Sequence, residues 1–211
     1  MIGDRWGVTE DETLRSYPCD DFVASPTLQA WRGVSVRAPA EAVWPWVAQV
    51  RLAPYSYDWL DNRGRRSPRE LAGLPEPRAG ERFTTAGGRQ AGRIVSVEPG
   101  RQLTATIMGA FMSYVLVPAD QDVTRLLLKV VARTSRLAAR GLSVGDLIMA
   151  RRQLLNLRQL AERQYHGATG GLALCAWRTR ADGLERGVPG ALRSIWHDGG
   201  RRPARGGFDI N

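Results

Sequence analysis

Five aromatic residues between positions 44 and 59 are the sharpest candidates for chemistry in this sequence. They are Trp44, Trp46, Tyr55, Tyr57 and Trp59. Flat aromatic rings contact apolar ligands over a large area, and a tyrosine hydroxyl group can fix the orientation of a bound molecule. The same residues also suit plain core packing between a helix and a sheet. The pattern predicts that at least two of them line a ligand pocket.

Three further residues are candidates for the same pocket. Met112 and Tyr114 alternate on an expected strand, so both side chains lie on one face of the sheet, and we expect Tyr114 to point inward. Met149, near the start of a long expected helix, suits an adaptable pocket floor, although core filling explains it as well. The candidate ligand-binding residues are therefore Trp46, Tyr55, Tyr57, Trp59, Met112, Tyr114 and Met149.

Catalytic and metal-binding patterns are weak in this sequence, and we assign no catalytic residue, no metal ligand and no cofactor. Asp58 is better read as a partner of a nearby arginine than as an acid or base. His166 and His197 are the only histidines, and both lie at or beyond the end of the main expected domain. This placement argues against a histidine-dependent triad or a zinc site there. The arginines at 63, 65, 66 and 69 fit an anion site, but we favour a solvated loop.

Composition restricts the class of protein. The 211 residues carry a net charge of +9, and arginine supplies all basic residues except Lys129. The basic residues are scattered among acidic ones, so we expect no specific nucleic-acid partner. Cys19 and Cys175 form no metal or redox motif. No stretch is long and apolar enough for a signal peptide or a membrane span, and we expect a soluble cytoplasmic protein.

The region from Ser143 to Tyr165 predicts a long amphipathic helix. Its apolar residues recur every three or four positions, at Leu147, Ala150, Leu154, Leu157 and Ala161. Polar residues, including Arg152 and Arg163, fall on the other side. Burying each large apolar side chain contributes roughly 1.5–3 kcal/mol, so the helix needs a partner surface.

Strand-like runs upstream supply that surface. Alternating polar and apolar residues predict about six strands, at 30–37, 81–86, 92–97, 102–108, 111–117 and 123–133. Two short helices are expected after the first strand, one from Pro39 to about Val50 and one from Ser67. This order is typical of an α+β fold with a curved antiparallel sheet around a long helix.

The two ends of the chain are expected to lie outside this domain. Residues 1–29 form an N-terminal extension with a short helix, which Thr9 and Glu12 begin at capping-box spacing. Residues 30–166 form the main domain. Residues 167–211 hold many glycines and arginines and predict a disordered tail, or an extension produced by read-through or a frame shift.

Several motifs carry a resemblance to a known family. The N-terminal Trp6-Gly7-Val8-Thr9, the helix motif Ala38-Pro39-Ala40-Glu41-Ala42-Val43-Trp44-Pro45-Trp46, and the loop motif Tyr55-Ser56-Tyr57-Asp58-Trp59 are its main parts. Over about residues 6–165 the chain resembles the START-like superfamily of helix-grip proteins, also called SRPBCC. Within it, the chain is most similar to the bacterial polyketide cyclase/dehydrase-like branch.

The resemblance implies one cavity between the sheet and the final helix that holds a small hydrophobic or lipid-like ligand. We therefore expect a binding or carrier protein without chemistry of its own. The alternative is an aromatase/cyclase-type enzyme without a metal, which acts on a polyketide-like or other apolar carbonyl substrate. A third possibility is peripheral binding of nucleic acid or membrane through the basic tail.

Overall fold

The computed structural model describes residues 3–57, 64, 66–86, 89–134 and 148–168. The chain divides into two units, Met1–His166 and Gly167–Asn211. The expected tail therefore lies almost wholly outside the described residues, as do Trp59, Asp58 and the expected start of the long helix at Ser143.

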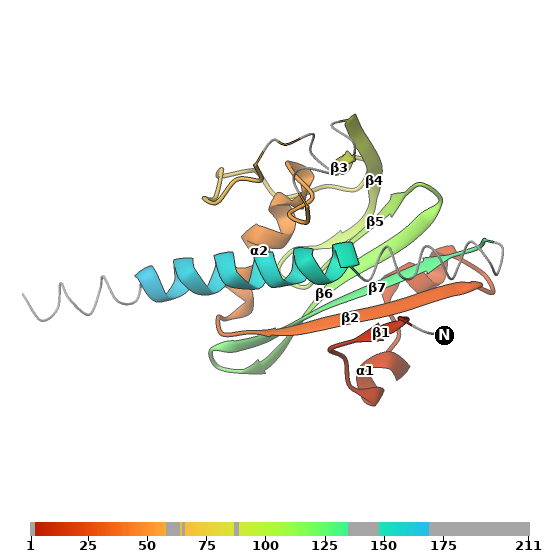
Figure 1. The fold of residues 1–211 in the computed structure, drawn as a ribbon, viewed down its shortest axis with the longest axis horizontal. Coiled ribbons are helices and arrows are strands. Elements are labelled where there is room, and N and C mark those ends of the chain that lie inside the picture. Colours follow the sequence, from red (N-terminus) through yellow and green to blue (C-terminus); the bar gives the residue numbers. More distant parts are fainter. Residues whose placement is uncertain (1–2, 58–63, 65, 87–88, 135–147, 169–211) are drawn as a thin grey trace, which may run out of the picture. The chain divides into compact units, whose positions relative to one another are not determined.

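The first unit contains short helices, strands and one long helix (Figure 1). The helices are α1 (Glu10–Leu14), the 3₁₀ helix η1 (Pro18–Phe22), α2 (Ala40–Ala48) and the 3₁₀ helix η2 (Gln49–Arg51). The strands are β1 (Arg5–Trp6), β2 (Leu28–Val36), β3 (Arg82–Ala86), β4 (Arg89–Glu98), β5 (Gln102–Ile107), β6 (Ala110–Asp120) and β7 (Val123–Ala132). Residues 148–168 form the long helix, here called the final helix.

The strands form one sheet in the order β1-β2-β7-β6-β5-β4-β3. All neighbours pair antiparallel except β1, which runs parallel to β2. Irregular register in β4 at Ile94–Ser96 and in β6 at Pro118–Asp120 marks bulges, which bend and twist a strand. The six predicted strands are thus confirmed. The structure adds β1, which was not predicted because a strand of two residues is too short to show an alternating pattern.

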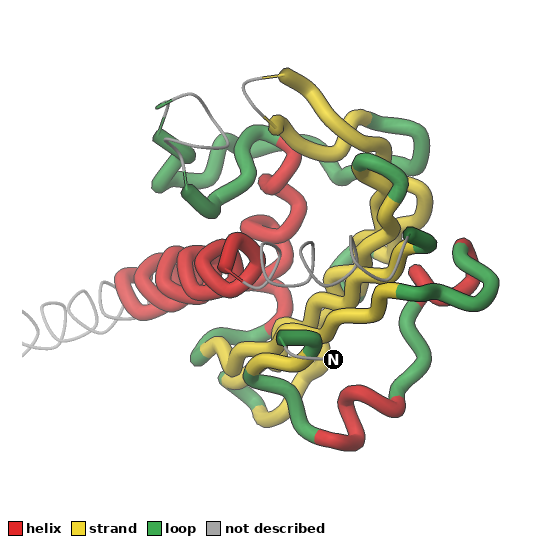
Figure 2. Tube along the Cα trace, turned by 45° about the vertical axis from the view of Figure 1, so that its right-hand side comes forward, coloured by secondary structure: helices red, strands yellow, loops and turns green. Residues whose placement is uncertain are grey.

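The final helix covers one face of the curved sheet together with α2, and α1 lies on the other face (Figure 2). Ala150, Leu154, Leu157 and Ala161 of the helix are buried in the main core. Leu126, Leu128 and Val130 of β7 join the same core, as the alternation of that strand predicts. The helix-grip arrangement is confirmed.

Both faces of the sheet are covered, which the sequence analysis did not anticipate. Leu127 and Val131 of β7 point away from the final helix and form a second buried cluster with Tyr17 and Cys19. The N-terminal segment thus packs on the outer face of the sheet. The sequence signal for this arrangement is that Leu127 and Val131 lie on the same face of the strand as the charged residues Arg125, Lys129 and Arg133.

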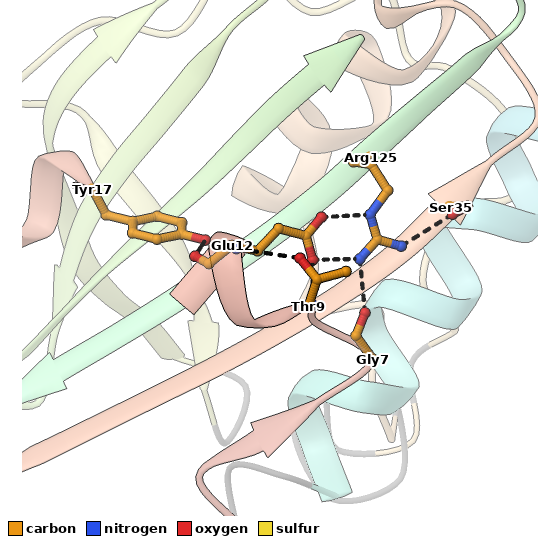
Figure 3. Close-up of polar contacts among 6 residues, drawn as sticks. All are labelled: Gly7, Thr9, Glu12, Tyr17, Ser35 and Arg125. Carbon is orange, nitrogen blue, oxygen red and sulfur yellow. Dashed lines mark hydrogen bonds and ion pairs between the residues drawn. The ribbon is translucent and has the colours of Figure 1, made fainter. Parts of the chain in front are cut away.

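A charged cluster holds the N-terminal segment on the outer face (Figure 3). The Arg125 guanidinium binds both carboxylate oxygens of Glu12, at 2.7 and 2.8 Å, and also donates to Ser35 Oγ and the Gly7 carbonyl oxygen. Thr9 and Glu12 form the predicted capping box. Gly7 has φ +68°, and an added Cβ there would lie 2.2 Å from the Gly33 carbonyl oxygen. Only a residue without a side chain allows this close approach.

One helical prediction is wrong. The expected helix from Ser67 does not form: residues 66–68 and 71–78 have no regular structure. The second helical piece after β2 is instead η2, which directly follows α2. Ser67, Pro68 and Glu70 have the spacing of a helix start, but only a few residues separate them from Gly73 and Pro75. So short a helix gains little without packing of its own.

Candidate functional site

Three pockets lie along one side of the final helix. The middle pocket, of about 540 Å³, is lined by helix residues from Arg152 to Arg163 and by loop residues from Tyr55 to Arg69. A pocket of about 310 Å³ shares Tyr57 and Arg152 with it, and a pocket of about 330 Å³ shares Arg69, Leu160 and Arg163. Because neighbouring pockets share lining residues, the three lie next to one another along the helix, and we call them together the helix groove.

The helix side of the groove follows from helical periodicity. Arg152, Asn156, Gln159 and Arg163 recur at intervals of four, three and four residues. They therefore form a stripe beside the apolar one. Arg152 and Arg163 are about 16 Å apart along the helix axis at 1.5 Å per residue, so they mark the two ends of the middle pocket.

The opposite wall consists of the described residues 53–57, 64 and 66–72, which form no helix or strand and are held by three amide side chains. We call these residues the loop wall. Gln49, which is buried, donates to the Tyr55 hydroxyl at 2.7 Å and to the Glu70 carbonyl oxygen at 2.9 Å. Its own side-chain oxygen accepts a hydrogen bond from the Ala72 backbone N–H at 2.7 Å. One glutamine thus fixes both ends of the segment, because an amide supplies two donors and an acceptor.

Two further amides tie the segment to the final helix. Asn156 donates to the Tyr55 carbonyl oxygen at 2.8 Å, and Gln153 donates to the Pro54 carbonyl oxygen. The side-chain oxygen of Gln153 accepts a hydrogen bond of 2.6 Å from the Tyr114 hydroxyl on β6. Gln153 therefore joins sheet, helix and loop in one buried contact.

Tyr55 is held in an uncommon backbone conformation. Its φ of 55° lies in the left-handed region, which a bulky residue rarely adopts. The side chain is buried, and its ring meets that of Trp46 edge to face at 6.4 Å. The hydrogen bonds at its hydroxyl and carbonyl groups support this conformation. Residues held this way often shape a binding site.

Cationic groups dominate the middle pocket. Four arginines line it, Arg66, Arg69, Arg152 and Arg163, and no acidic side chain is among its described lining residues. None of these four makes an ion pair with a residue that the structure describes. Apolar surface lies at the two ends, with Trp46, Leu71 and Leu160 in one end pocket and Ile148 and Leu155 in the other.

The predicted ligand-binding residues fall into three groups. Tyr55 and Tyr57 line the middle pocket and Trp46 lines an end pocket. Tyr114 is buried and contacts the helix through Gln153, and half-buried Met112 places its sulfur 3.9 Å from the Tyr114 hydroxyl. Met149 is half-buried near the start of the described helix. Trp59 lies outside the described residues.

Sequence reasoning missed most of the polar lining. Arg152, Asn156, Gln159 and Arg163 were placed on the polar side of the helix and given no role. For Arg66 and Arg69 a solvated loop was favoured over an anion site; both residues are exposed and both line the middle pocket. Arg63 and Arg65 lie outside the described residues. The available signal in the sequence was the group of arginines at 63, 65, 66 and 69 in the loop, together with Arg152 and Arg163 on one stripe of the helix.

The strongest pKa shifts lie away from the groove, on the outer face of the sheet. Burial raises the pKa of the Tyr17 hydroxyl to about 12 and that of the Cys19 thiol to about 11. Burial also raises the pKa of Glu12, but the hydrogen bonds from Arg125 and Thr9 outweigh this effect, and the net pKa is lowered. These groups belong to the packing of the N-terminal segment.

Strand order, register and the buried stripe of the final helix decide the architecture. The first unit has the helix-grip fold. No family model matches the sequence, and a search of curated proteins finds no match. Among the described residues, no helix is both long and apolar enough to cross a bilayer, and no group of three potential metal ligands occurs.

Solved structures similar to this chain include three bacterial proteins. Cgl2372 from Corynebacterium glutamicum, described as Polyketide_cyc-like, is 12% identical over 67% of this chain and 95% of that chain, with a TM-score of 0.43. A protein from Thermobifida fusca is 22% identical over 64% of this chain and 93% of that chain, with a TM-score of 0.46. Protein NE0264 from Nitrosomonas europaea is 12% identical over 65% of this chain and 96% of that chain, with a TM-score of 0.47.

Proposed function

We propose that this protein binds or carries a small hydrophobic ligand in the helix groove. The observation that carries the proposal is the row of three adjacent pockets, whose middle pocket of about 540 Å³ is of the size that small ligands occupy. Its end pockets offer apolar contacts from Trp46, Leu71, Leu160 and Leu155. The groove lies beside the final helix, whereas the family resemblance implies a cavity between the sheet and that helix.

The rigid support of the groove also favours binding. Buried Gln49 and Gln153 fix the loop wall before any ligand arrives. A wall that is already ordered loses little conformational entropy on binding, which favours affinity. The groove is therefore suited to hold a molecule.

The proposal is tested with a neutral apolar probe and a variant that fills the groove. N-phenyl-1-naphthylamine fluoresces when it leaves water for an apolar site. Gln159→Trp places an indole ring in the middle pocket, since Gln159 is an exposed lining residue. We expect wild-type protein to bind the probe and the variant to bind it at least about tenfold more weakly, equivalent to 1.4 kcal/mol.

Leu14→Trp is the matched control, because it adds the same ring on α1, where Leu14 is already 79% exposed. It should bind the probe as wild type does. Absence of probe binding by wild type, or equal binding by Gln159→Trp and wild type, would contradict the proposed function.

A further inference from the structure

We infer that the ligand of the helix groove is an amphiphilic anion, with a carboxylate or phosphate-type group in the middle pocket and an apolar portion toward Trp46 and Leu160. This inference rests on the proposed function and goes further, because it names the chemical class of the ligand. Charge, hydrogen-bonding chemistry and the distribution of apolar surface each support it.

The charge argument begins with how arginines are used elsewhere in this chain. Arg51 pairs with Glu81, Arg101 with Glu98 and Arg125 with Glu12, each at 2.7 Å. By contrast, the four arginines of the middle pocket have no carboxylate partner among the described residues. Like charges that face a shared pocket repel one another, and a bound anion relieves this repulsion.

The cluster is also assembled from separate parts of the chain. Arg66 and Arg69 come from the loop wall, whereas Arg152 and Arg163 come from the final helix. The described wall residues are fixed to the helix through Gln153 and Asn156. The convergence of charges is therefore a property of the folded structure and differs from a run of basic residues on one exposed segment.

Guanidinium chemistry indicates the type of anion. Arginine presents a planar set of donors that matches the paired oxygens of carboxylates and phosphates. Arg69 and Arg163 line both the middle pocket and the neighbouring end pocket. That end pocket also holds Trp46, Leu71 and Leu160 and one carboxylate, Glu70, so two arginines face one acidic residue there. An anionic group beside these two residues would be adjacent to apolar surface.

The apolar surface requires a second part of the ligand. Trp46, Leu71 and Leu160 line the pocket that continues from Arg69 and Arg163. A free inorganic anion would leave the exposed parts of Leu71 and Leu160 in water, whereas the apolar part of an amphiphile would cover them and gain about 25 cal/mol per Å². Trp46 is already buried and forms the floor behind them. The groove therefore favours an anion attached to an apolar body over a free anion.

The experiment compares two probes that share one skeleton. The dye 8-anilinonaphthalene-1-sulfonate has the N-phenylnaphthylamine skeleton with an added sulfonate, and N-phenyl-1-naphthylamine lacks the charge. Both are titrated into the full-length protein at about 50 mM and about 500 mM salt, which changes the screening length several-fold. We expect the anionic dye to bind at least about fivefold more tightly at low salt and to lose this advantage at high salt.

Substitutions then locate the charge effect. The variant Arg69→Gln/Arg163→Gln should weaken the anionic dye by roughly fivefold to tenfold, as expected for two exposed charge interactions, and should weaken it several-fold more than it weakens the neutral probe. The control Arg101→Gln/Arg158→Gln removes the same charge at residues that do not line the groove, and should change neither affinity beyond twofold. Circular dichroism confirms that both variants fold.

The outcomes separate this inference from the proposed function. Equal affinities for the two dyes, or equal effects of the groove and control variants, would overturn the inference. The proposed function would still stand if the neutral probe binds in the groove. Failure of both dyes to bind would overturn both. Inorganic phosphate should displace the anionic dye much less effectively than dodecyl phosphate; equal displacement would show a simple anion site and would overturn the amphiphile. Strong binding of a short DNA that abolishes dye binding would likewise overturn it.

Discussion

Arg125 shows how one residue organises the outer face of the sheet. Its guanidinium contacts α1 through Glu12, the chain after β1 through Gly7, and β2 through Ser35. Both charged side chains are largely buried, with 20% and 16% of their surface exposed. A charge-assisted pair of this kind contributes more to stability than a pair on the open surface.

The first prediction concerns the pH dependence of this pair. Because the pKa of Glu12 in the folded state is lower than its ordinary value of 4.5, the stabilising contribution is full above that value and is lost as the pH falls through the folded-state pKa. Glu12→Gln should lower the free energy of unfolding by about 1–3 kcal/mol near neutral pH, and the difference from wild type should shrink as the pH falls below 4.5 and through the folded-state pKa. Urea unfolding across pH measures this.

Glu10→Gln is the control, because Glu10 lies in the same first turn but is exposed. It should leave both stability and its pH dependence close to those of wild type. A Glu12→Gln variant with the same acid dependence as wild type would contradict the role given to the pair.

The second prediction concerns the buried thiol of Cys19. Burial raises its pKa to about 11, and Cys19 lies in η1, where its backbone N–H donates to Ser113 Oγ. In a Cys175→Ser variant, Cys19 should react with a thiol reagent at least about 100-fold more slowly in the native state than in urea, because the thiolate is the reactive form. Rapid native-state labelling would show that the N-terminal segment does not cover it.

Residue chemistry alone predicted part of the site. The density of aromatic residues between positions 44 and 59 predicted pocket-lining residues, and Tyr55, Tyr57 and Trp46 border the helix groove. Their contact with a ligand stays a prediction. The arginine cluster was missed because its members are distant in sequence and look like ordinary solvated charges. Their proximity depends on tertiary contacts that no local pattern contains.

At the scale of elements, Gln153 links β6, the final helix and the loop wall. The third prediction is that Gln153→Leu lowers the free energy of unfolding by about 1–3 kcal/mol, because buried polar partners lose their hydrogen bonds. It should also speed amide hydrogen exchange in residues 53–57. Unfolding curves and exchange mass spectrometry measure the two effects.

Gln159→Leu is the matched control on the same helix. Gln159 is exposed, whereas Gln153 is only 8% exposed, so the same substitution should change stability by less than about 0.5 kcal/mol. Similar losses in the two variants would contradict the role of Gln153 as a support of the groove.

Elements with strong periodicity were predictable, and those held by tertiary contacts were not. Alternation identified β2, β5, β6 and β7, and the capping box of Thr9 and Glu12 identified α1. The segment after Ser67 carries helix-start residues, but Gln49 binds its backbone at Glu70 and Ala72 and holds it in an irregular form. The hydrogen bonds of buried Gln49, at the C-terminal end of α2, therefore outweigh the local helix preference of this segment.

At the scale of the whole first unit, the sheet has a different covering on each face. The main core lies between the sheet and the helices α2 and 148–168, and the second cluster lies under residues 17–23. The helix groove lies beside the final helix, against the loop wall. This arrangement leaves one side of the final helix available for a ligand while its other side anchors it to the sheet.

The most direct measurement is a two-dimensional NMR spectrum of isotope-labelled protein with and without N-phenyl-1-naphthylamine. The account predicts shifts in the Trp46 indole N–H, which donates to Gln164, and in the side-chain amides of Asn156 and Gln159. The Trp31 indole, which packs with the outer-face cluster, should not move. Shifts confined to Trp31 and the N-terminal segment, or none at any of these groups, would contradict the assignment of the ligand to the helix groove.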